Sequence, residues 1–167
     1  MSERPNVFDP AFAPDEEPSG FQRRRATVGE QAGAQRLGAS VFELEPRRTS
    51  SPYHGHLGNE ELLVVLAGRP TLRTPAGSRE LAPGEVVAFR LGDEGLHQVS
   101  NFGRETVRYL IVSEMRAPEV IVYPDSGKLG AYGYPPGPAC EGLREFHVRE
   151  AKVDLWKGET PPEAPGG

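Results

Sequence analysis

Cysteine and long apolar runs are almost absent from this sequence. Cys140 is the only cysteine in 167 residues, so no disulfide can form within the chain. The longest apolar run, LLVVLA at residues 62–67, is far too short to cross a bilayer. The opening residues, MSERPNVFDPAF, contain no apolar stretch of the kind that a secretory signal needs. We therefore expect a cytoplasmic protein without a membrane partner, and we expect Cys140 to be an ordinary thiol.

An excess of positive charge is also missing. The formal net charge is −5, so the chain has no strong basic field that would attract nucleic acid. No helix-turn-helix pattern precedes the strand-rich region, which also argues against a DNA-binding protein. The local exception is QRRR at residues 22–25, a short basic run that we expect to be solvated.

Helical periodicity is scarce, whereas turn-forming residues are plentiful. The 20 glycines and 17 prolines follow no repeat, which favours many turns between short strands. Runs of β-branched and aromatic residues lie between these turns and predict an all-β sandwich or barrel. The expected strands are residues 36–44, 51–57, 61–67, 70–74, 79–82, 86–90, 97–101, 106–113 and 119–123.

The composition divides the chain into three parts. Residues 1–34 are polar and aperiodic, and we expect an N-terminal arm that is flexible or wraps over a surface. Residues 35–125 hold the expected barrel. Residues 126–167 form a C-terminal extension, in which we expect a short strand, a helical turn and a disordered tail, TPPEAPGG. The side chains expected to pack this extension on the outside of the barrel are Phe146, Val148, Leu155 and Trp156.

Three of the four histidines lie near carboxylates in the strand-rich part. His54 and His56 are two apart, so on a strand both imidazoles point to the same face. Glu60 and Glu61 follow them, and His97 begins a later strand. Imidazole and carboxylate are ligands for transition metals. The spacing alone leaves two interpretations open, a metal site or ordinary core and surface histidines.

Two motifs in this region resemble those of the cupin superfamily. The first reads His54, His56, Glu61 and Gly68, and the second reads Gly77, Pro83, His97 and Asn101. The resemblance covers about residues 38–113, and the later stretch EVIVYPDSGKLGAY is similar to single-domain bacterial cupins. One departure is Arg48, which stands where the family often has a glycine six residues before the first histidine.

The resemblance implies both a fold and a cofactor. The fold is a double-stranded β-helix, a jelly-roll-like barrel. The cofactor is one divalent ion of iron, manganese, nickel, cobalt or zinc, and the implied ligands are His54, His56, Glu61 and His97. The choice of Glu61 over Glu60 rests on the family spacing. Four ligands leave two open positions on an octahedral ion, whereas structural zinc would be closed by the same four.

The expected barrel mouth is largely apolar. Gln98 is a weak candidate for it, because a regular strand would turn it away from the face of His97. If Glu61 faces inward, then Leu62, Val64 and Leu66 face outward, where a second sheet or a partner subunit must cover them. We therefore expect a homodimer. The residues expected to line the cavity are Tyr53, Leu63, Val65, Phe89, Val99, Tyr109 and Ile111.

Such a cavity suits a small organic ligand with an oxygen pair, such as a sugar derivative, a keto acid or an aromatic diol. The first hypothesis is a metal-dependent oxygenase, isomerase or decarboxylase. The second is a binding or sensing barrel without catalysis. The third is a dimer in which the metal contributes stability alone. The fold does not choose among these functions, because one barrel hosts many of them.

Overall fold

The computed structural model describes residues 4–13, 20–133 and 142–160 of the chain. Three antiparallel sheets account for its strands. One short α-helix, α1, spans Val28–Gln31, and 3₁₀ helices lie at Gly92–Gly95, Pro124–Ser126 and Arg149–Ala151. The all-β prediction is confirmed by this architecture. Cys140 and most of the TPPEAPGG segment lie outside the described residues, so the predictions made for them remain predictions.

The largest sheet has five strands in the order β1-β2-β10-β5-β8. Burial along β5 alternates, with Leu63 and Val65 buried and Leu62 exposed, as expected for a strand with one face in the core. Gly68 ends β5 at φ +72°, and a Cβ there would lie 2.8 Å from the Val107 side chain. The strands are β1 (Arg24–Ala26), β2 (Leu37–Leu44), β5 (Glu61–Ala67), β8 (Val86–Phe89) and β10 (Val107–Glu114).

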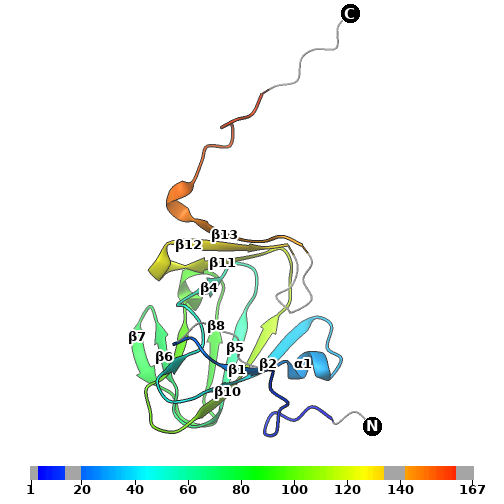
Figure 1. Ribbon diagram of the computed structural model, residues 1–167, viewed down its shortest axis with the longest axis vertical. Helices are drawn as coiled ribbons and strands as arrows, with labels where there is room; N and C mark the ends of the chain where they lie inside the picture. The colour runs from blue at the N-terminus through cyan, green and yellow to red at the C-terminus, as the bar shows by residue number, and fades with distance from the viewer. Residues whose placement is uncertain (1–3, 14–19, 134–141, 161–167) are drawn as a thin grey trace, which may run out of the picture.

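Two four-stranded sheets complete the fold (Figure 1). The sheet β3-β9-β6-β7 forms another wall of the barrel, and the sheet β13-β12-β11-β4 lies across one end. The first comprises β3 (Arg48–Thr49), β6 (Thr71–Thr74), β7 (Gly77–Glu80) and β9 (Gln98–Asn101). The second comprises β4 (Gly55–His56), β11 (Glu119–Tyr123), β12 (Lys128–Tyr132) and β13 (Arg144–Val148).

The main hydrophobic core lies between the five-stranded sheet and the sheet that contains β6 and β9. Tyr109 and Phe42, neighbours on β10 and β2, stack with ring centroids 5.4 Å apart. Burial of this apolar surface is the main force that holds the two walls together. The core comprises Phe42, Leu44, Leu63, Val65, Leu72, Leu81, Phe89, Val99, Val107 and Tyr109.

The observed strands follow the expected ones with one substantial difference. The ranges 61–67 and 119–123 have the predicted bounds, and the other central strands shift by one or two residues at their ends. The expected strand 51–57 is reduced to Gly55–His56, because Ser50 to Tyr53 form bends. His54 still pairs with His97 through an isolated bridge, so the two histidines are held by backbone hydrogen bonds across different segments.

The described part of the N-terminal arm packs on the barrel of its own chain. Its strand β1 pairs with β2, and its residue Phe12 packs on a second cluster of Ala26, Val28 and Val41. Leu66, on the outward face of β5, joins this cluster. The sequence did not predict this packing, because the few apolar residues of the arm follow no periodic pattern. The arm therefore covers part of the face that we expected a second sheet or subunit to cover.

The C-terminal extension adds two strands to a sheet. β12 pairs with β11, and β13 pairs with β12. Phe146 contributes to a pocket, whereas Val148, Leu155 and Trp156 are 53%, 77% and 73% exposed. The expected packing of these three side chains on the barrel is thus absent from the described chain. Among the described residues, no helix is both long and apolar enough to cross a membrane.

Candidate metal centre

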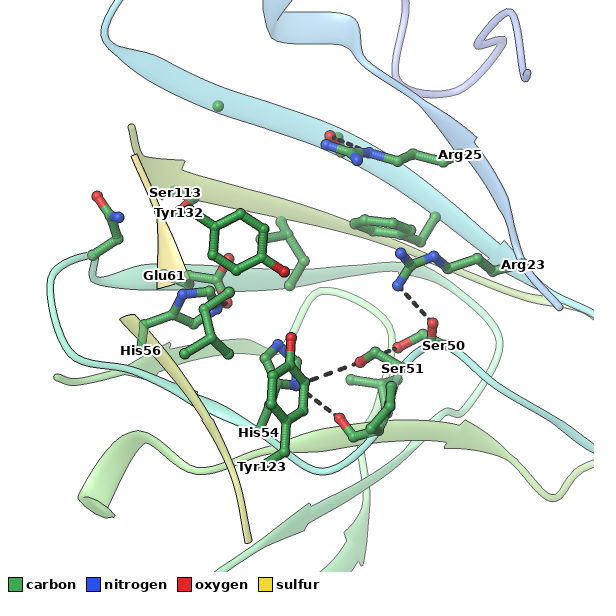
Figure 2. Close-up of a pocket in the computed structure, with 18 of the residues that line it drawn as sticks. Arg23, Arg25, Ser50, Ser51, His54, His56, Glu61, Ser113, Tyr123 and Tyr132 are labelled. Carbon is green, nitrogen blue, oxygen red and sulfur yellow. Dashed lines mark hydrogen bonds and ion pairs between the residues drawn. The ribbon is translucent and has the colours of Figure 1, made fainter. Parts of the chain in front are cut away.

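The four predicted ligands come together at one end of the barrel. His54 and His97 face each other across a backbone bridge, with N–O distances of 3.1 and 2.7 Å. His56 lies on β4, which pairs with β11, and Glu61 begins β5. Figure 2 shows His54, His56 and Glu61 gathered at the side of a pocket. Glu60, the neighbouring carboxylate, is exposed.

Glu61 is the common neighbour of the imidazoles. Its Oε2 lies 3.4 Å from His56 Nε2 and 3.4 Å from His97 Nε2. The ligand atoms of His54, His56 and Glu61 all lie within 4.8 Å of one another. The His54 ring centroid is 4.5 Å from that of His97. These separations group His54, His56 and Glu61 around a single small volume, and His97 lies beside the group through its contact with Glu61.

Backbone carbonyls fix the tautomer of two imidazoles, that is, which ring nitrogen carries the proton. His54 Nδ1 lies 2.8 Å from the Pro52 carbonyl, and His97 Nδ1 lies 2.9 Å from the Gly95 carbonyl. A carbonyl only accepts, so Nδ1 carries the proton in each ring and Nε2 presents a lone pair. Gly95 has no room for a Cβ, which would lie 1.6 Å from the Arg90 carbonyl oxygen. This glycine therefore permits the tight turn that positions His97.

His56 faces the carboxylate of Glu119, which no motif in the sequence indicated. Its Nδ1 lies 3.6 Å from Glu119 Oε1, and neither of its buried ring nitrogens has a hydrogen-bond partner among the described residues. Glu119 is 1% exposed and accepts hydrogen bonds from the backbone N–H groups of Leu57 and Gly58 and from the Asn59 amide. Because β11 and the 57–59 loop meet only in the fold, spacing gave no signal for this contact.

Burial and neighbouring charges shift the pKa values of these four side chains in different directions. Burial lowers the pKa of His54 to about 3, and the nearby histidines add to this effect. Burial also lowers the pKa of His97. For His56, burial is outweighed by the Glu119 and Glu61 carboxylates, which raise its pKa to about 9. For Glu61, burial is likewise outweighed by His56 and the other imidazoles, which lower its pKa to about 2.

This donor set fits a divalent transition metal. Three imidazoles and one carboxylate are common ligands of iron, manganese, nickel, cobalt and zinc. The unpartnered Nε2 of His56 is a buried polar atom that would otherwise carry a desolvation cost. Asn101, from the second motif, makes structural hydrogen bonds instead. It is fully buried and donates to the Leu44 and Glu105 carbonyls, which stabilises the chain after β9.

The cluster opens into a cavity of about 380 Å³. Val99, Tyr109 and Ile111 line this cavity, together with His54, His56 and Glu61. Other residues expected there lie elsewhere: Leu63, Val65 and Phe89 pack in the main core, and Tyr53 lies under the Arg73 guanidinium. Phe89 contacts the cluster from the core side, because its ring stacks on His97 at 3.8 Å. Gln98 donates to the Ser51 carbonyl.

Several polar residues of the pocket were not anticipated from the sequence. Tyr123 stacks beside His54, with ring centroids 6.0 Å apart, and Tyr132 lies near it on β12. Arg23 and Arg25 also line the cavity and are only partly exposed. The expectation that QRRR is a solvated run is therefore wrong for these two arginines, because β1 turns alternate side chains inward.

A family profile described as a cupin domain matches residues 40–113. The chain contains a cupin domain. This match confirms the resemblance that the two motifs indicated, and the matched range contains all four predicted ligands. No curated protein matches the chain significantly.

Several solved structures of differently named proteins are similar to this chain. A protein from Acidithiobacillus ferrooxidans named as a sugar phosphate isomerase has 25% identity and a TM-score of 0.74, covering 86% of this chain and 87% of its own. One from Silicibacter pomeroyi, also named a sugar phosphate isomerase, has 22% identity and a TM-score of 0.69, with coverages of 89% and 92%. The polyketide cyclase RemF from Streptomyces resistomycificus has 26% identity and a TM-score of 0.58, with coverages of 71% and 84%.

Proposed function

We propose that this cupin is a metal-dependent enzyme that isomerises a small hydroxy-carbonyl compound such as a sugar derivative. One divalent metal ion would be held by His54, His56, Glu61 and His97. The observation that carries the proposal is the orientation of the imidazoles. The Nδ1 atoms of His54 and His97 contact carbonyls, which leaves Nε2 of each ring as the metal-binding nitrogen, and His97 Nε2 lies 3.4 Å from Glu61 Oε2. When bound, a divalent ion acts as a Lewis acid on a carbonyl or hydroxyl oxygen.

The chain itself would bind and orient the compound. Val99 and Ile111 provide apolar contacts at the pocket wall. Burial raises the pKa of Tyr109 to about 12, so its phenol stays neutral and can donate a hydrogen bond. Burial also raises the pKa of Tyr123, beside His54, which keeps a second neutral phenol near the cluster.

Isomerisation is preferred to oxygenation or decarboxylation for two reasons. The pocket is rich in hydroxyl and charged groups, including Ser40, Ser50 and Ser51, which suits a polyhydroxylated compound better than an aromatic diol. The 25% identical protein from A. ferrooxidans, which is named as a sugar phosphate isomerase, matches over 87% of its length. Oxygenation and decarboxylation remain outcomes that the assay below distinguishes.

The first experiment is elemental analysis of untagged protein purified without metal-affinity resin. The test variant is His54→Ala/His56→Ala, and the matched control is His147→Ala, because His147 is exposed on β13 and pairs with Glu145. We expect close to one equivalent of metal in the wild type and the control, and little in the double variant. Absence of metal from all three after reconstitution would contradict the metal site.

The second experiment follows the reaction of metal-loaded protein with a panel of aldoses, ketoses and their derivatives. Isomerisation proceeds without dioxygen and releases no carbon dioxide. Anaerobic turnover therefore separates it from oxygenation, and the absence of released carbon dioxide separates it from decarboxylation. A compound that raises the melting temperature but is never consumed would support a binding barrel instead. Loss of stability on chelation without any ligand binding would support a purely structural metal.

We also propose a cytoplasmic homodimer. Leu62 on β5 and Val86 on β8 are exposed, and β8 is an edge strand of its sheet. Ala88 on β8 lies opposite Leu62 in the strand register. A second copy packed there would bury these apolar groups. Light scattering coupled to gel filtration should give twice the mass of one chain, and Val86→Lys should reduce it to a single chain. A single-chain mass for the wild type would contradict the dimer.

A further inference from the structure

Two arginines approach the pocket from the N-terminal arm. Arg23 precedes β1 and Arg25 lies within it, so strand alternation points both side chains to one face. Figure 2 shows them extending into the pocket toward the side that carries His54, His56 and Glu61. Arg24 lies between them and points the other way, where it pairs with Glu43 at 2.8 Å and covers the Phe12 ring.

The two guanidinium groups are positioned by the pocket wall. Their Cζ atoms lie 5.1 and 5.6 Å from the centre of the Phe42 ring, which is the register partner of Arg25 on β2. Arg23 donates to the Ser50 carbonyl at 2.6 Å, and Arg25 donates through Nε to the Ser40 hydroxyl at 3.1 Å. Ring contact and hydrogen bonds together restrict these long side chains, which lowers the entropy lost when a ligand binds.

The described lining of the pocket is positively charged, opposite in sign to the net charge of the chain. Among the described residues that line it, Arg23, Arg25, Lys128 and Arg144 are cationic, and Glu61 is the sole carboxylate. Glu61 lies within the histidine cluster, away from the arginines in Figure 2. A cavity lined by one sign of charge concentrates ligands of the other sign, even though the chain carries −5 overall.

The chemistry of the arginine side favours a phosphate group. A carboxylate is planar, and one bidentate guanidinium satisfies it. A phosphomonoester presents three oxygens with a charge near −2, so it can accept from two guanidinium groups and from hydroxyls at once. Ser40, Ser50 and Ser51 also line the cavity and supply those hydroxyls. The volume of about 380 Å³ is at the small end of ligand pockets, which suits a small phosphorylated compound.

We propose that Arg23 and Arg25 bind the phosphate of a small phosphomonoester whose other end faces His54, His56 and Glu61. The inference rests on the proposed function in placing that other end at the metal cluster. The phosphate site itself is built from residues of the arm, of β2 and of the segment that follows β3, none of which is a candidate metal ligand. Phosphate binding can therefore be measured separately from metal content and from turnover.

The test is isothermal titration calorimetry with ribose 5-phosphate, ribose and inorganic phosphate as probes. Arg23→Gln and Arg25→Gln retain most of the side-chain stem but lose the charge. Arg24→Gln is the matched control, because Arg24 is an adjacent arginine on the opposite face. Each protein is titrated after chelation and after metal loading, with its metal content and thermal unfolding measured on the same sample.

We expect ribose 5-phosphate to bind far more tightly than ribose. Arg23→Gln and Arg25→Gln should each weaken its binding about tenfold or more, since each removes a charge-assisted contact. Arg24→Gln should change it by less than about twofold, because Arg24 is not among the residues that line the cavity and pairs with Glu43 on the other face. The same pattern in chelated protein, or in protein that never takes up metal, would support the phosphate site even if the proposed function fails.

Three results would overturn the inference. The first is metal-loaded protein whose ribose 5-phosphate affinity does not depend on Arg23 or Arg25, which would leave the proposed function intact. The second is inorganic phosphate binding as tightly as ribose 5-phosphate, which would assign the arginines to a free anion. The third is absence of binding by both phosphate probes up to about 10 mM, a weaker affinity than such a site should give.

Discussion

The Glu119 carboxylate faces His56 Nδ1 at 3.6 Å, on the opposite edge of the ring from Glu61. A carboxylate in this position fixes the orientation of an imidazole and raises its basicity. Glu119→Gln should therefore lower metal affinity by about 10- to 100-fold. Competition with a chelator measures the affinity, and the absorption spectrum of cobalt-loaded protein reports the ligand geometry.

Glu60→Gln is the control for this prediction, because Glu60 is exposed next to the ligand Glu61. It should bind metal like the wild type. Equal affinities for Glu119→Gln and Glu60→Gln, in variants that unfold at the same temperature, would show that Glu119 does not orient His56.

Leu63 and Leu62 offer a matched pair on the two faces of β5. Leu63 is fully buried in the main core, whereas Leu62 is 38% exposed. Leu63→Ala should lower the free energy of unfolding by about 2–5 kcal/mol, because it leaves a cavity in the core. Leu62→Ala should cost less than about 1 kcal/mol in the monomer. Urea unfolding measures both, and similar losses would contradict the assigned faces.

The Asn101 side chain forms hydrogen bonds with backbone groups at the end of β9 and in the loop that follows. It donates to the Leu44 and Glu105 carbonyls and accepts from the Gly103 N–H, and the Asn101 side chain itself is fully buried. Asn101→Ala removes all three hydrogen bonds and leaves the buried Leu44 carbonyl without this partner, so it should lower the free energy of unfolding by about 1–3 kcal/mol. The metal content of the folded variant should be unchanged. Loss of metal with unchanged stability would instead assign Asn101 to the metal site.

Asp125 and Arg73 form an exposed ion pair whose two N–O distances are 2.6 and 2.8 Å. The hydrogen bonds from Arg73 outweigh the small effect of burial and lower the pKa of Asp125. The pair therefore contributes its stability above the ordinary Asp pKa and loses it as pH falls through the lowered value. In Arg73→Ala, a nuclear magnetic resonance titration should return Asp125 to its ordinary pKa. The same midpoint in both proteins would contradict the pairing in solution.

The sequence was most informative where function depends on local spacing. The His-x-His pair and the later Glu61 and His97 matched a family pattern, and the structure brings all four to one end of the barrel. Strand alternation, combined with the inward Glu61 that the family spacing implies, predicted the buried and outward faces of β5. Alternation also predicts too long a strand at residues 51–57. Only Gly55–His56 pairs with another strand there.

The sequence alone therefore determined the all-β class and most strand positions, and its resemblance to the cupin motifs supplied the candidate ligands, because period-2 burial and motif spacing are local properties. Only the tertiary structure decided which groups surround those ligands. Glu119 reaches His56 because β11 pairs with β4, and Arg23 and Arg25 reach the cavity because β1 pairs with β2. These contacts arise from pairing between segments far apart in the chain, whose register no local pattern encodes.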